Sequence, residues 1–513
     1  MSHGLAETLA SALARRQTQL VLALVSAGSA GLLFKINGHI GLGSADEGFL
    51  WYGSLAVLRG EVPIRDFQAY EPGRYYWVAV FMRFLASDGL VTLRVSLAAC
   101  QALAVFLGLS ALSRAVYNLV GLTLAGALLL LWMWPSCRAF ESALTLAAVL
   151  VGTRLLESPL AVRAFEAGVF VGVAAFFGRN HGVYAFVALS ALLLWSGRGQ
   201  REGRVRRLAA LGGGVAIGAL PLFLYAALVP GFARAELELN SIYLRVGATN
   251  LSRGIGLPWE SSNREGRLLS LTLMLLPILY VGGSWRSKRG GRVAPLLLAS
   301  SVVGATYYHH VWSRIDLAHL ASAIQPALVC AVALCSPCAS KFRPRPVALA
   351  VGLTTLWLSS LVARRQLEVI AGPQRRVSVP LAVRGETLQV GEPAAAMFRA
   401  LQQFRGQVLR PGESILVGPA APGIYAAIDV ASPVWTLFFW FPETVERQRQ
   451  MIEALRYKNT NWVLLCTTAL DAEPELRFAS THQVFWHHIK RTFGEYTIPD
   501  LGAGCRMWRR RDN

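Results

Sequence analysis

Residues 44–77 read SADEGFLWYGSLAVLRGEVPIRDFQAYEPGRYYW, and they follow the first long apolar segment of the chain. The most informative feature of this stretch is the adjacent pair of carboxylates, Asp46 and Glu47. Charged groups are costly within a bilayer, so carboxylates directly after an apolar segment serve either chemistry or hydration at its surface. The composition and the other motifs distinguish these two uses.

The composition is that of a membrane protein. Hydrophobic residues make up 54% of the 513 residues, charged residues make up 16%, and the mean hydropathy is +0.43. The sequence predicts an α-helical polytopic membrane protein with about eleven segments able to cross a hydrocarbon core of roughly 30 Å. These segments are residues 18–35, 90–113, 117–135, 141–156, 164–178, 182–196, 208–229, 268–283, 293–308, 318–335 and 346–363.

The net charge of +20 raises the question of a nucleic-acid surface. The basic residues lie in alternate loops between the predicted spans, and the positive-inside rule places these loops and the N-terminus in the cytoplasm. A nucleic-acid surface would not be divided among alternate loops. A cleaved signal peptide is the alternative for the first span, since residues 27–30 (Ala-Gly-Ser-Ala) resemble a cleavage site. The loop residues are Arg15, Arg16, Arg154, Arg163, Arg198, Arg201, Arg204, Arg206, Arg207, Arg286, Lys288, Arg289, Arg292, Lys341, Arg343 and Arg345.

The external face carries a different mixture of residues. Its segments combine carboxylates, imidazoles and arginines, whereas the cytoplasmic loops are almost purely basic. This asymmetry favours a functional site on the external side. The external segments are residues 46–47, 71–74, 137–141, 179–181, 230–267 and 309–319.

Two short helices are expected at this face. Apolar residues recur at helical spacing over residues 46–59, which predicts a helix lying in the membrane interface. Gly60 and Pro63 end this helix, and Pro72 begins a second segment over residues 74–85 that is rich in the aromatic residues typical of the headgroup level. The two helices would frame a cleft through which a lipid-linked substrate enters.

The order of motifs resembles the GT-C superfamily of integral-membrane glycosyltransferases, and especially the protein O-mannosyltransferases and the lipid A aminoarabinose transferase. The resemblance covers about the first 360 residues in topology, and residues 46–94 in motif. A later pattern, Arg314-x-Asp316-x-x-His319, is similar to a motif of many bacterial members. The earlier motifs are Asp46-Glu47-Gly48, Gly60-Glu61-x-Pro63-x-Arg65-Asp66, Glu71-Pro72, Tyr75-Tyr76-Trp77, and Arg94 at the start of the next span.

The resemblance implies transfer of a sugar from a polyprenyl-phosphate donor to an external acceptor, with inversion at the anomeric carbon. It assigns the role of general base to Asp46, with Glu47 orienting the acceptor. A carboxylate within hydrogen-bond reach of the acceptor hydroxyl can supply roughly 10² to 10⁴ in rate. The alternative is that Asp46 only caps the surface helix. No metal and no cofactor are expected, because the nearer relatives act without metal.

A departing lipid phosphate needs cations or hydrogen-bond donors around it. The chain differs here from the aminoarabinose transferase, which has a lysine between the glutamate and the proline, whereas Glu71 directly precedes Pro72 and Arg74 is the nearby cation. Each arginine could instead balance an acidic neighbour or extend to the interface. The arginine candidates are Arg65, Arg74, Arg94, Arg179, Arg245 and Arg314, and the predicted substrate-binding set adds Asp66, Glu71, Glu141, Asp316 and His319.

Two of these predictions have specific alternatives. Glu141 ends an external turn near the place where relatives carry an acidic residue, and a solvated glutamate is the other interpretation. Asp316 and His319 lie beside His309 and His310, and these four residues form a conceivable zinc or manganese site. A substrate-binding cluster is preferred over a metal site on the strength of the family resemblance.

Residues 364–513 lack long apolar runs and predict a small external α/β domain after the transmembrane domain of residues 1–363. Strands are expected at residues 414–418 and 462–466, and helices at residues 443–457 and 482–493. Residues 418–423 are glycine- and proline-rich and predict a turn instead of a phosphate-binding loop. Cys466 and Cys505 could form a disulfide in an oxidising space, while Cys335 and Cys338 are interpreted as packing residues.

The sequence as a whole predicts a multi-pass glycosyltransferase of a bacterial inner membrane, using a polyprenyl-phosphate hexose or pentose and a glycan, lipid or protein acceptor. Its N-terminus is expected in the cytoplasm and its C-terminal domain outside, with residues 230–267 as a substrate lid. Two other classes stay open, a transporter or lipid carrier and a structural membrane protein. A transporter would have ionisable residues distributed within its spans, whereas here they concentrate at one face.

Overall fold

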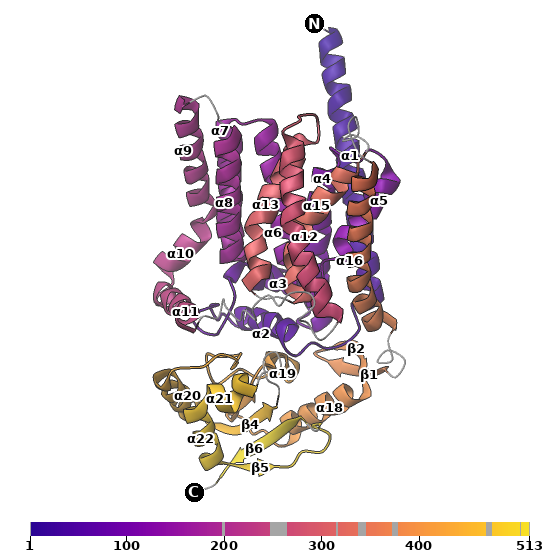
Figure 1. Ribbon diagram of the computed structural model, residues 1–513. Helices are drawn as coiled ribbons and strands as arrows, with labels where there is room; N and C mark the ends of the chain where they lie inside the picture. Colours follow the sequence, from indigo (N-terminus) through magenta and orange to yellow (C-terminus); the bar gives the residue numbers. More distant parts are fainter. Residues whose placement is uncertain are drawn as a thin grey trace. The chain divides into compact units, whose positions relative to one another are not determined.

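A computed structural model describes residues 2–196, 201–246, 264–313, 316–336, 345–371, 378–467, 474–502 and 504–511. The chain divides into two compact units (Figure 1). Unit 1 comprises Met1–Ile36, Leu97–Tyr225 and Thr249–Gln366, and unit 2 comprises Asn37–Ser96, Ala226–Ala248 and Leu367–Asn513.

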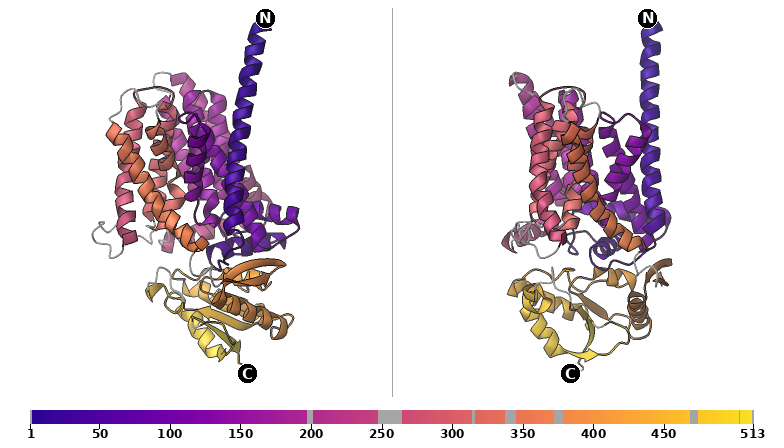
Figure 2. Two further views of the ribbon diagram at one scale, coloured as in Figure 1. Left: turned by 90° about the vertical axis from the view of Figure 1, so that its right-hand side faces the viewer. Right: turned by 45° about the vertical axis from the view of Figure 1, so that its right-hand side comes forward.

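Every regular element of unit 1 among the described residues is a helix. In both views of Figure 2, α1 extends past the ends of the other helices of this unit. The first turns of α4 belong to unit 2. The helices are α1 (Ser2–Asn37), α4 (Leu90–Leu112), α5 (Leu119–Leu131), η1 (Ser136–Arg138), α6 (Ala139–Glu157), α7 (Ala161–Phe177), α8 (Arg179–Ser196), α9 (Arg201–Gly218), α10 (Leu220–Leu228), α12 (Arg264–Ser287), α13 (Ala294–Ser313), α14 (Leu317–Ala323), α15 (Gln325–Cys335) and α16 (Arg345–Ala371).

The predicted number of about eleven spans is not confirmed. Four helical stretches of the described chain are long and apolar enough to cross a membrane, or up to six if two bent helix pairs each count as one span. The bends measure 49° between α9 and α10 and 59° between α14 and α15. The predicted span 117–135 contains only α5, which ends at Leu131. The four stretches are Arg16–Asn37, Leu90–Leu112, Ser136–Glu157 and Leu269–Ser287.

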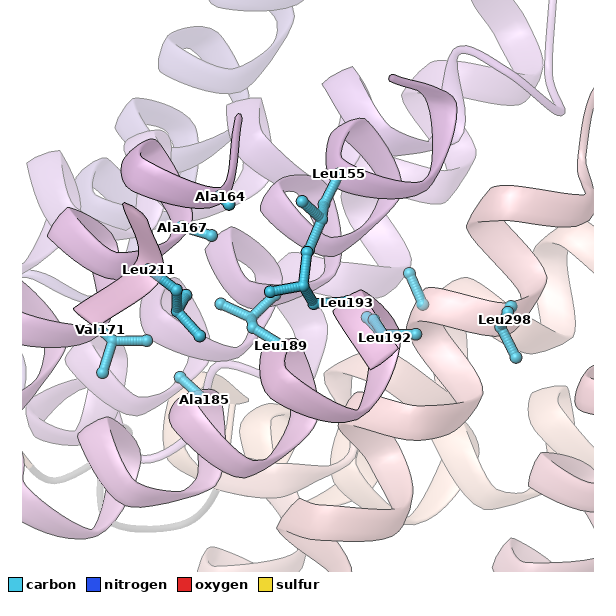
Figure 3. Packing of buried hydrophobic residues seen from close by; sticks show 11 residues of the cluster. Leu155, Ala164, Ala167, Val171, Ala185, Leu189, Leu192, Leu193, Leu211 and Leu298 are labelled. Carbon is cyan, nitrogen blue, oxygen red and sulfur yellow. The ribbon is translucent and has the colours of Figure 1, made fainter. Parts of the chain in front are cut away.

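Part of the hydrophobic core of unit 1 lies among α6, α7, α8, α9 and α13 (Figure 3). Leu189, Leu192 and Leu193 of α8 are fully buried there, between Leu155 of α6 and Leu211 of α9. The small residues of α7, such as Ala164 and Ala167, allow the neighbouring helices to approach closely.

Helices α7 and α9 show this close approach in its strongest form. A Cβ atom added at Gly168 would clash with the backbone of α9, and one added at Gly214 or Gly218 would clash with the backbone of α7. Small residues four positions apart on both helices are typical of helix contacts in membranes, where close backbone packing replaces the hydrophobic effect between helices.

Unit 2 contains a mixed sheet and several helices. The four-stranded sheet has the order β3-β4-β6-β5, with β3 parallel to β4 and the other pairs antiparallel, and β1 and β2 form a separate antiparallel hairpin. The elements are α2 (Asp46–Leu58), α3 (Pro72–Leu85), α11 (Phe232–Val246), β1 (Ser378–Val383), β2 (Glu386–Gly391), α18 (Glu392–Gln407), β3 (Ser414–Gly418), α19 (Pro422–Ala427), α20 (Val445–Tyr457), β4 (Thr460–Cys466), η4 (Pro474–Leu476), α21 (Phe478–Thr481), α22 (Gln483–Thr492), β5 (Phe493–Tyr496) and β6 (Cys505–Arg510).

The sheet confirms the predicted α/β character of the C-terminal residues. The strands predicted at 414–418 and 462–466 are β3 and β4, and the helices predicted at 443–457 and 482–493 are α20 and α22. A disulfide joins Cys466 of β4 to Cys505 of β6, which are paired residues in the ladder. The core of this fold includes Leu416, Val463 and Phe485. Residues 415–418 of β3 and 462–465 of β4 are buried without alternation, so both faces of these two parallel strands are covered.

The segment that follows α1 and the C-terminal residues fold together within unit 2. Helix α2 packs on α19 so closely that a Cβ atom at Gly48 would lie 2.5 Å from the Cα atom of Gly423. The ring of Phe49 stacks on Phe438 with centroids 4.5 Å apart. The carboxylate of Glu386 on β2 accepts hydrogen bonds from the backbone N–H of Val91 (2.6 Å) and of the residue after it (3.1 Å) at the start of α4.

Two further expectations concern the boundaries of these parts. The predicted division at 363/364 lies close to the border between units at Gln366 and Leu367, but residues 37–96 group with the C-terminal residues. The predicted lid, residues 230–267, is a helix rather than a loop over 232–246 (α11), because Phe232 to Val246 form an amphipathic stretch. Residues 247–263 of the predicted lid lie outside the described residues.

Candidate active site

The predicted site residues fall into two groups. Asp46, Glu47, Arg65, Asp66, Glu71, Arg74 and Arg94 belong to unit 2, and Glu141, Arg179, Asp316 and His319 belong to unit 1. Arg314 lies outside the described residues, and so does the side chain of Arg245.

Glu47 is held by Arg94 in a bidentate ion pair. The Nε atom of Arg94 donates to Oε1 of Glu47 at 2.7 Å, and Nη2 donates to Oε2 at 2.8 Å. Both side chains are nearly buried, with relative exposures of 10% for Arg94 and 13% for Glu47. The backbone N–H of Gly43 donates a third hydrogen bond to Oε2 at 3.1 Å. Planar, charge-assisted pairs of this kind fix geometry as well as adding energy.

The same arginine also fixes the chain before α2. Its Nη1 atom donates to the carbonyl oxygens of Gly38 and Ile40, and its Nη2 atom to that of Gly41, each at 3.0 Å. We call residues 38–47 together with Arg94 the Asp46 loop. Every hydrogen-bonding group of the guanidinium is directed into this loop, so Arg94 positions the loop.

Asp46 is the first residue of α2 and is half-buried. The N-cap of this helix is Ala45, and the cap has no side-chain hydrogen bond, so Asp46 is not the capping residue that the alternative interpretation required. A carboxylate in the first turn of a helix lies at the positive end of the helix dipole. The neighbouring Glu47 is engaged by Arg94.

The other predicted residues of unit 2 have local partners. Arg65 forms two hydrogen bonds of 2.8 Å with Asp66, and Asp66 also accepts from the backbone N–H of Val62 at 2.7 Å. The hydrogen bond from Arg65 lowers the pKa of Asp66 below its ordinary value. This pair fits the prediction's alternative, in which an arginine balances its acidic neighbour.

Glu71 and Arg74 occupy the start of α3. Glu71 is the N-cap residue, Pro72 is the first helical residue, and both Glu71 and Arg74 are buried with 8% relative exposure. The guanidinium of Arg74 lies over the ring of Tyr70 at 5.3 Å from its centroid. A buried cation and a buried carboxylate three residues apart are costly unless they serve binding or pair with other groups.

In unit 1, three imidazoles lie in a row. The ring centroids of His181 and His310 are 5.6 Å apart, and those of His310 and His319 are also 5.6 Å apart. The row begins on α8, passes α13 and ends on α14. We call these three residues, together with Tyr184 and Tyr307, the histidine cluster.

Tyrosines support the row of imidazoles. The hydroxyl of Tyr307 lies 3.2 Å from Nδ1 of His181, and the rings of Tyr184 and Tyr307 meet edge to face at 5.0 Å. His181 and Tyr307 are both almost fully buried. Glu141 at the start of α6 is also buried, which argues against the solvated glutamate of the alternative interpretation.

Asp316 orients the last imidazole of the row. It is the N-cap residue of α14, and its carboxylate accepts hydrogen bonds of 2.8 Å from both the backbone N–H and the Nδ1 of His319. Burial alone would raise the pKa of the Asp316 carboxyl, but these hydrogen bonds and the nearby His319 charge outweigh burial and lower the pKa. A carboxylate on Nδ1 fixes the tautomer and ring orientation of a histidine and directs its Nε2 outward.

The conceivable metal site of His309, His310, Asp316 and His319 is not formed. Among the described residues, no group of three or more histidine, cysteine, aspartate and glutamate side chains is arranged to hold a metal ion. His309 instead contacts Tyr184, whose hydroxyl lies 3.0 Å from its Nδ1. Arg179, the first residue of α8, is half-buried two positions before His181.

Sequence reasoning missed two parts of this arrangement. His181 and Tyr184, and likewise Tyr307 and His310, are three residues apart on one helix, and this spacing places each pair on one helix face. That signal could have identified the tyrosines. The Asp46 loop has no comparable signal, because three of the acceptors of Arg94 are backbone carbonyl groups.

Comparison with known proteins identifies the fold. No protein-family model and no curated protein matches the sequence. Among solved structures, ArnT from Cupriavidus metallidurans bound to undecaprenyl phosphate superposes with a TM-score of 0.56 at 13% identity, over 97% of this chain and 98% of that one. The chain has a GT-C fold.

Two further solved structures are similar to this chain. The apo state of the same ArnT gives a TM-score of 0.52 at 13% identity, with 97% and 98% of the two chains covered. The oligosaccharyltransferase AglB from Archaeoglobus fulgidus, in complex with an inhibitory peptide and a dolichol-phosphate, gives 0.46 at 12% identity, over 94% of this chain and 73% of that one. The likeness to ArnT extends over 97% of this chain and supports the predicted GT-C type of fold, but not the predicted number of about eleven helices.

Proposed function

We propose that this chain is an inverting glycosyltransferase that moves a sugar from a polyprenyl-phosphate donor to an acceptor of the cell envelope. The observation that carries the proposal is Asp46 in the first turn of α2, next to a carboxylate that Arg94 already engages. Support comes from the GT-C fold, since the ArnT of similar fold is bound to undecaprenyl phosphate.

In the proposed reaction, the carboxylate of Asp46 removes the proton of the acceptor hydroxyl. The acceptor oxygen then attacks the anomeric carbon of the donor sugar from the face opposite the phosphate. The bond between the anomeric carbon and the phosphate oxygen breaks, and its electron pair leaves with the lipid phosphate. General-base assistance of this kind contributes roughly 10² to 10⁴ in rate.

The remaining predicted residues divide between positioning and binding in this proposal. Glu47 and Arg94 hold the Asp46 loop, while Arg65, which pairs with Asp66, and the buried Arg74 are the residues of unit 2 proposed to bind the lipid phosphate. In unit 1, the histidine cluster with Asp316 supplies hydrogen-bond donors suited to a phosphate. The protein works in a bacterial inner membrane with a cytoplasmic N-terminus and an external C-terminal part.

The test is sugar transfer in membranes that contain wild type or the Asp46→Asn variant, supplied with a panel of labelled polyprenyl-phosphate sugars. The isosteric change removes the base but keeps the size of the side chain, and transfer should fall roughly 10²- to 10⁴-fold. Asp500→Asn is the matched control, because Asp500 is exposed in the same unit and its left-handed backbone (φ 65°) accepts asparagine.

The control variant should transfer as wild type does, and all three proteins should reach equal membrane levels. Undiminished transfer by Asp46→Asn would remove Asp46 as the base. A wild-type protein that transfers no sugar from any donor of the panel would contradict the glycosyltransferase proposal and favour the transporter or lipid-carrier class.

A further inference from the structure

A groove of about 1040 Å³ lies between α20 and α22 in unit 2, in a part that contains none of the predicted site residues. Arg449, Glu453 and Arg456 line it from α20, and His487 and Arg491 line it from α22. The α20 residues follow the spacing i, i+4, i+7 and therefore lie on one helix face. The two helices present facing polar stripes, and the partly buried Ile452 and Val484 contribute apolar surface between them.

The groove is strongly cationic. Its lining contains four lysine and arginine side chains but only one carboxylate, that of Glu453. Arg449 is 4.0 Å from Glu446, an exposed pair, whereas none of the described residues forms an ion pair with Arg456 or Arg491. The C-terminal stretch 483–511 as a whole carries six lysine and arginine residues and two acidic residues. Like charges held this close repel one another unless an anion lies among them.

His488 reports the positive potential of the groove. It is half-buried on α22, and its pKa is lowered from the ordinary value first by burial and then by the charges of Arg456, Arg491 and Arg510. The hydroxyl of Thr492 is its hydrogen-bonding neighbour, at 3.5 Å from Nδ1. These three arginines come from α20, α22 and β6.

The dimensions indicate a ligand with several negative charges. Seven residues separate Arg449 from Arg456, which is roughly 10 Å along a helix axis. A single phosphate contacts only part of such a length, whereas two or more charged sugar units extend along all of it. The groove presents helix faces, so it has no free strand edge for an extended peptide, and its apolar surface is too small to hold an amphipathic helix.

We propose that the α20–α22 groove binds a polyanionic glycan, a sugar chain bearing carboxylate or phosphate groups, and that this chain is the acceptor. The acceptor role rests on the proposed function, whereas binding of the glycan does not. An anionic membrane surface is the competing source of negative charge. Figure 1 shows α22 beside the C-terminus, at the end of unit 2 away from α2, the helix expected in the membrane interface.

The experiment measures binding by the full-length protein in nanodiscs of zwitterionic lipid. The probes are polygalacturonate as an anionic polysaccharide, dextran as a neutral one, polyglutamate as an acidic peptide, and phosphatidylglycerol vesicles. Polygalacturonate should bind and dextran should not, and the binding should weaken as ionic strength rises, because exposed charges are screened by salt.

The variant Arg456→Gln/Arg491→Gln should bind polygalacturonate on the order of tenfold more weakly, since two charge-assisted contacts are lost. Arg410→Gln/Lys458→Gln is the matched control, because it removes two exposed positive charges of the same unit outside the groove and should bind normally. Equal loss in both variants, or in neither, would overturn the proposal. Stronger binding of polyglutamate or of the vesicles would overturn it in favour of a peptide or a membrane surface.

The Asp46→Asn variant distinguishes failure of the proposed function from failure of the glycan site. Asp46→Asn should bind polygalacturonate as wild type does, because Asp46 is not part of the groove. Intact binding without any sugar transfer would then count against the glycosyltransferase proposal and the acceptor role, and leave the glycan site supported. Transfer that persists while groove binding is absent would count against the glycan site alone.

Discussion

The Asp46 loop and the histidine cluster are both buried polar arrangements, but they are held in different ways. In the Asp46 loop, one guanidinium satisfies one carboxylate and three backbone carbonyls. In the histidine cluster, aromatic rings from different helices lie with neighbouring centroids 5.0 to 5.6 Å apart. An ion pair is lost completely when either partner is removed, whereas stacked rings lose their contacts one at a time. The comparison therefore predicts mutational effects of different size.

The largest effect is expected in the Asp46 loop. Arg94→Gln leaves the nearly buried Glu47 carboxylate without its cation, and the free energy of unfolding should fall by about 3–5 kcal/mol. Urea unfolding of the purified protein in detergent measures this loss. Glu47→Gln/Arg94→Gln removes both charges and should recover part of it, so the cycle of single and double variants gives a clear interaction energy. Purely additive losses would show that Glu47 and Arg94 do not stabilise each other. The predicted difference from the histidine cluster would then be absent.

Local patterns explain what the sequence predicted well in this region. Apolar spacing with Gly60 and Pro72 as end and start signals predicted helices over 46–59 and 74–85, close to α2 and α3. The ion pair between Glu47 and Arg94 could not be predicted in the same way, because the two residues are 47 positions apart and the carbonyl acceptors carry no side-chain signal. Arg94 was therefore predicted to bind the lipid phosphate. In the structure its guanidinium holds the loop before α2.

The predicted number of spans is not confirmed, for a related reason. Apolar length predicts that a segment is buried, but it does not show where a helix bends, and α9–α10 and α14–α15 are each bent by more than 40°. Residues 232–246 were expected in a loop because they are too polar for a span, yet their alternation of apolar and charged residues suits a surface helix. The pairs at i, i+3 in the histidine cluster were visible in the sequence, but their meeting across α8, α13 and α14 depends on helix packing.

A third region, around His482 in unit 2, shows what burial alone does to an imidazole. His482 is 2% exposed, lies between the rings of Phe478 and Phe439, and has a pKa that burial lowers to about 3. Between pH 6.5 and 3 the unfolded chain binds a proton that the folded chain does not, so stability falls as the pH falls. The loss should reach about 2 kcal/mol at pH 5.

Urea unfolding at pH 7 and pH 5, followed by tryptophan fluorescence, tests this prediction. The glutamine at position 482 of the His482→Gln variant does not titrate in this range. The variant should therefore lose less stability than wild type between the two pH values. An unchanged pH dependence in the variant would assign the acid sensitivity to other groups, among them the histidine cluster. The result thus decides whether burial of an imidazole in unit 2 has an energetic signature of its own.

The smallest effect is expected in the histidine cluster. Tyr307→Phe removes the hydroxyl near Nδ1 of His181 but keeps the ring, which should cost about 1 kcal/mol and raise the donor KM roughly fivefold with kcat nearly unchanged. Tyr308→Phe is the matched control, because it also deletes one hydroxyl of α13, one that donates instead to the carbonyl of Leu273 at 3.1 Å. Donor titrations of sugar transfer distinguish the two variants. Equal KM values would mean that the cluster stabilises the helices and does not bind the donor. A large loss of kcat in Tyr307→Phe would mean that removal of one group disables the cluster, as is expected for the Asp46 loop.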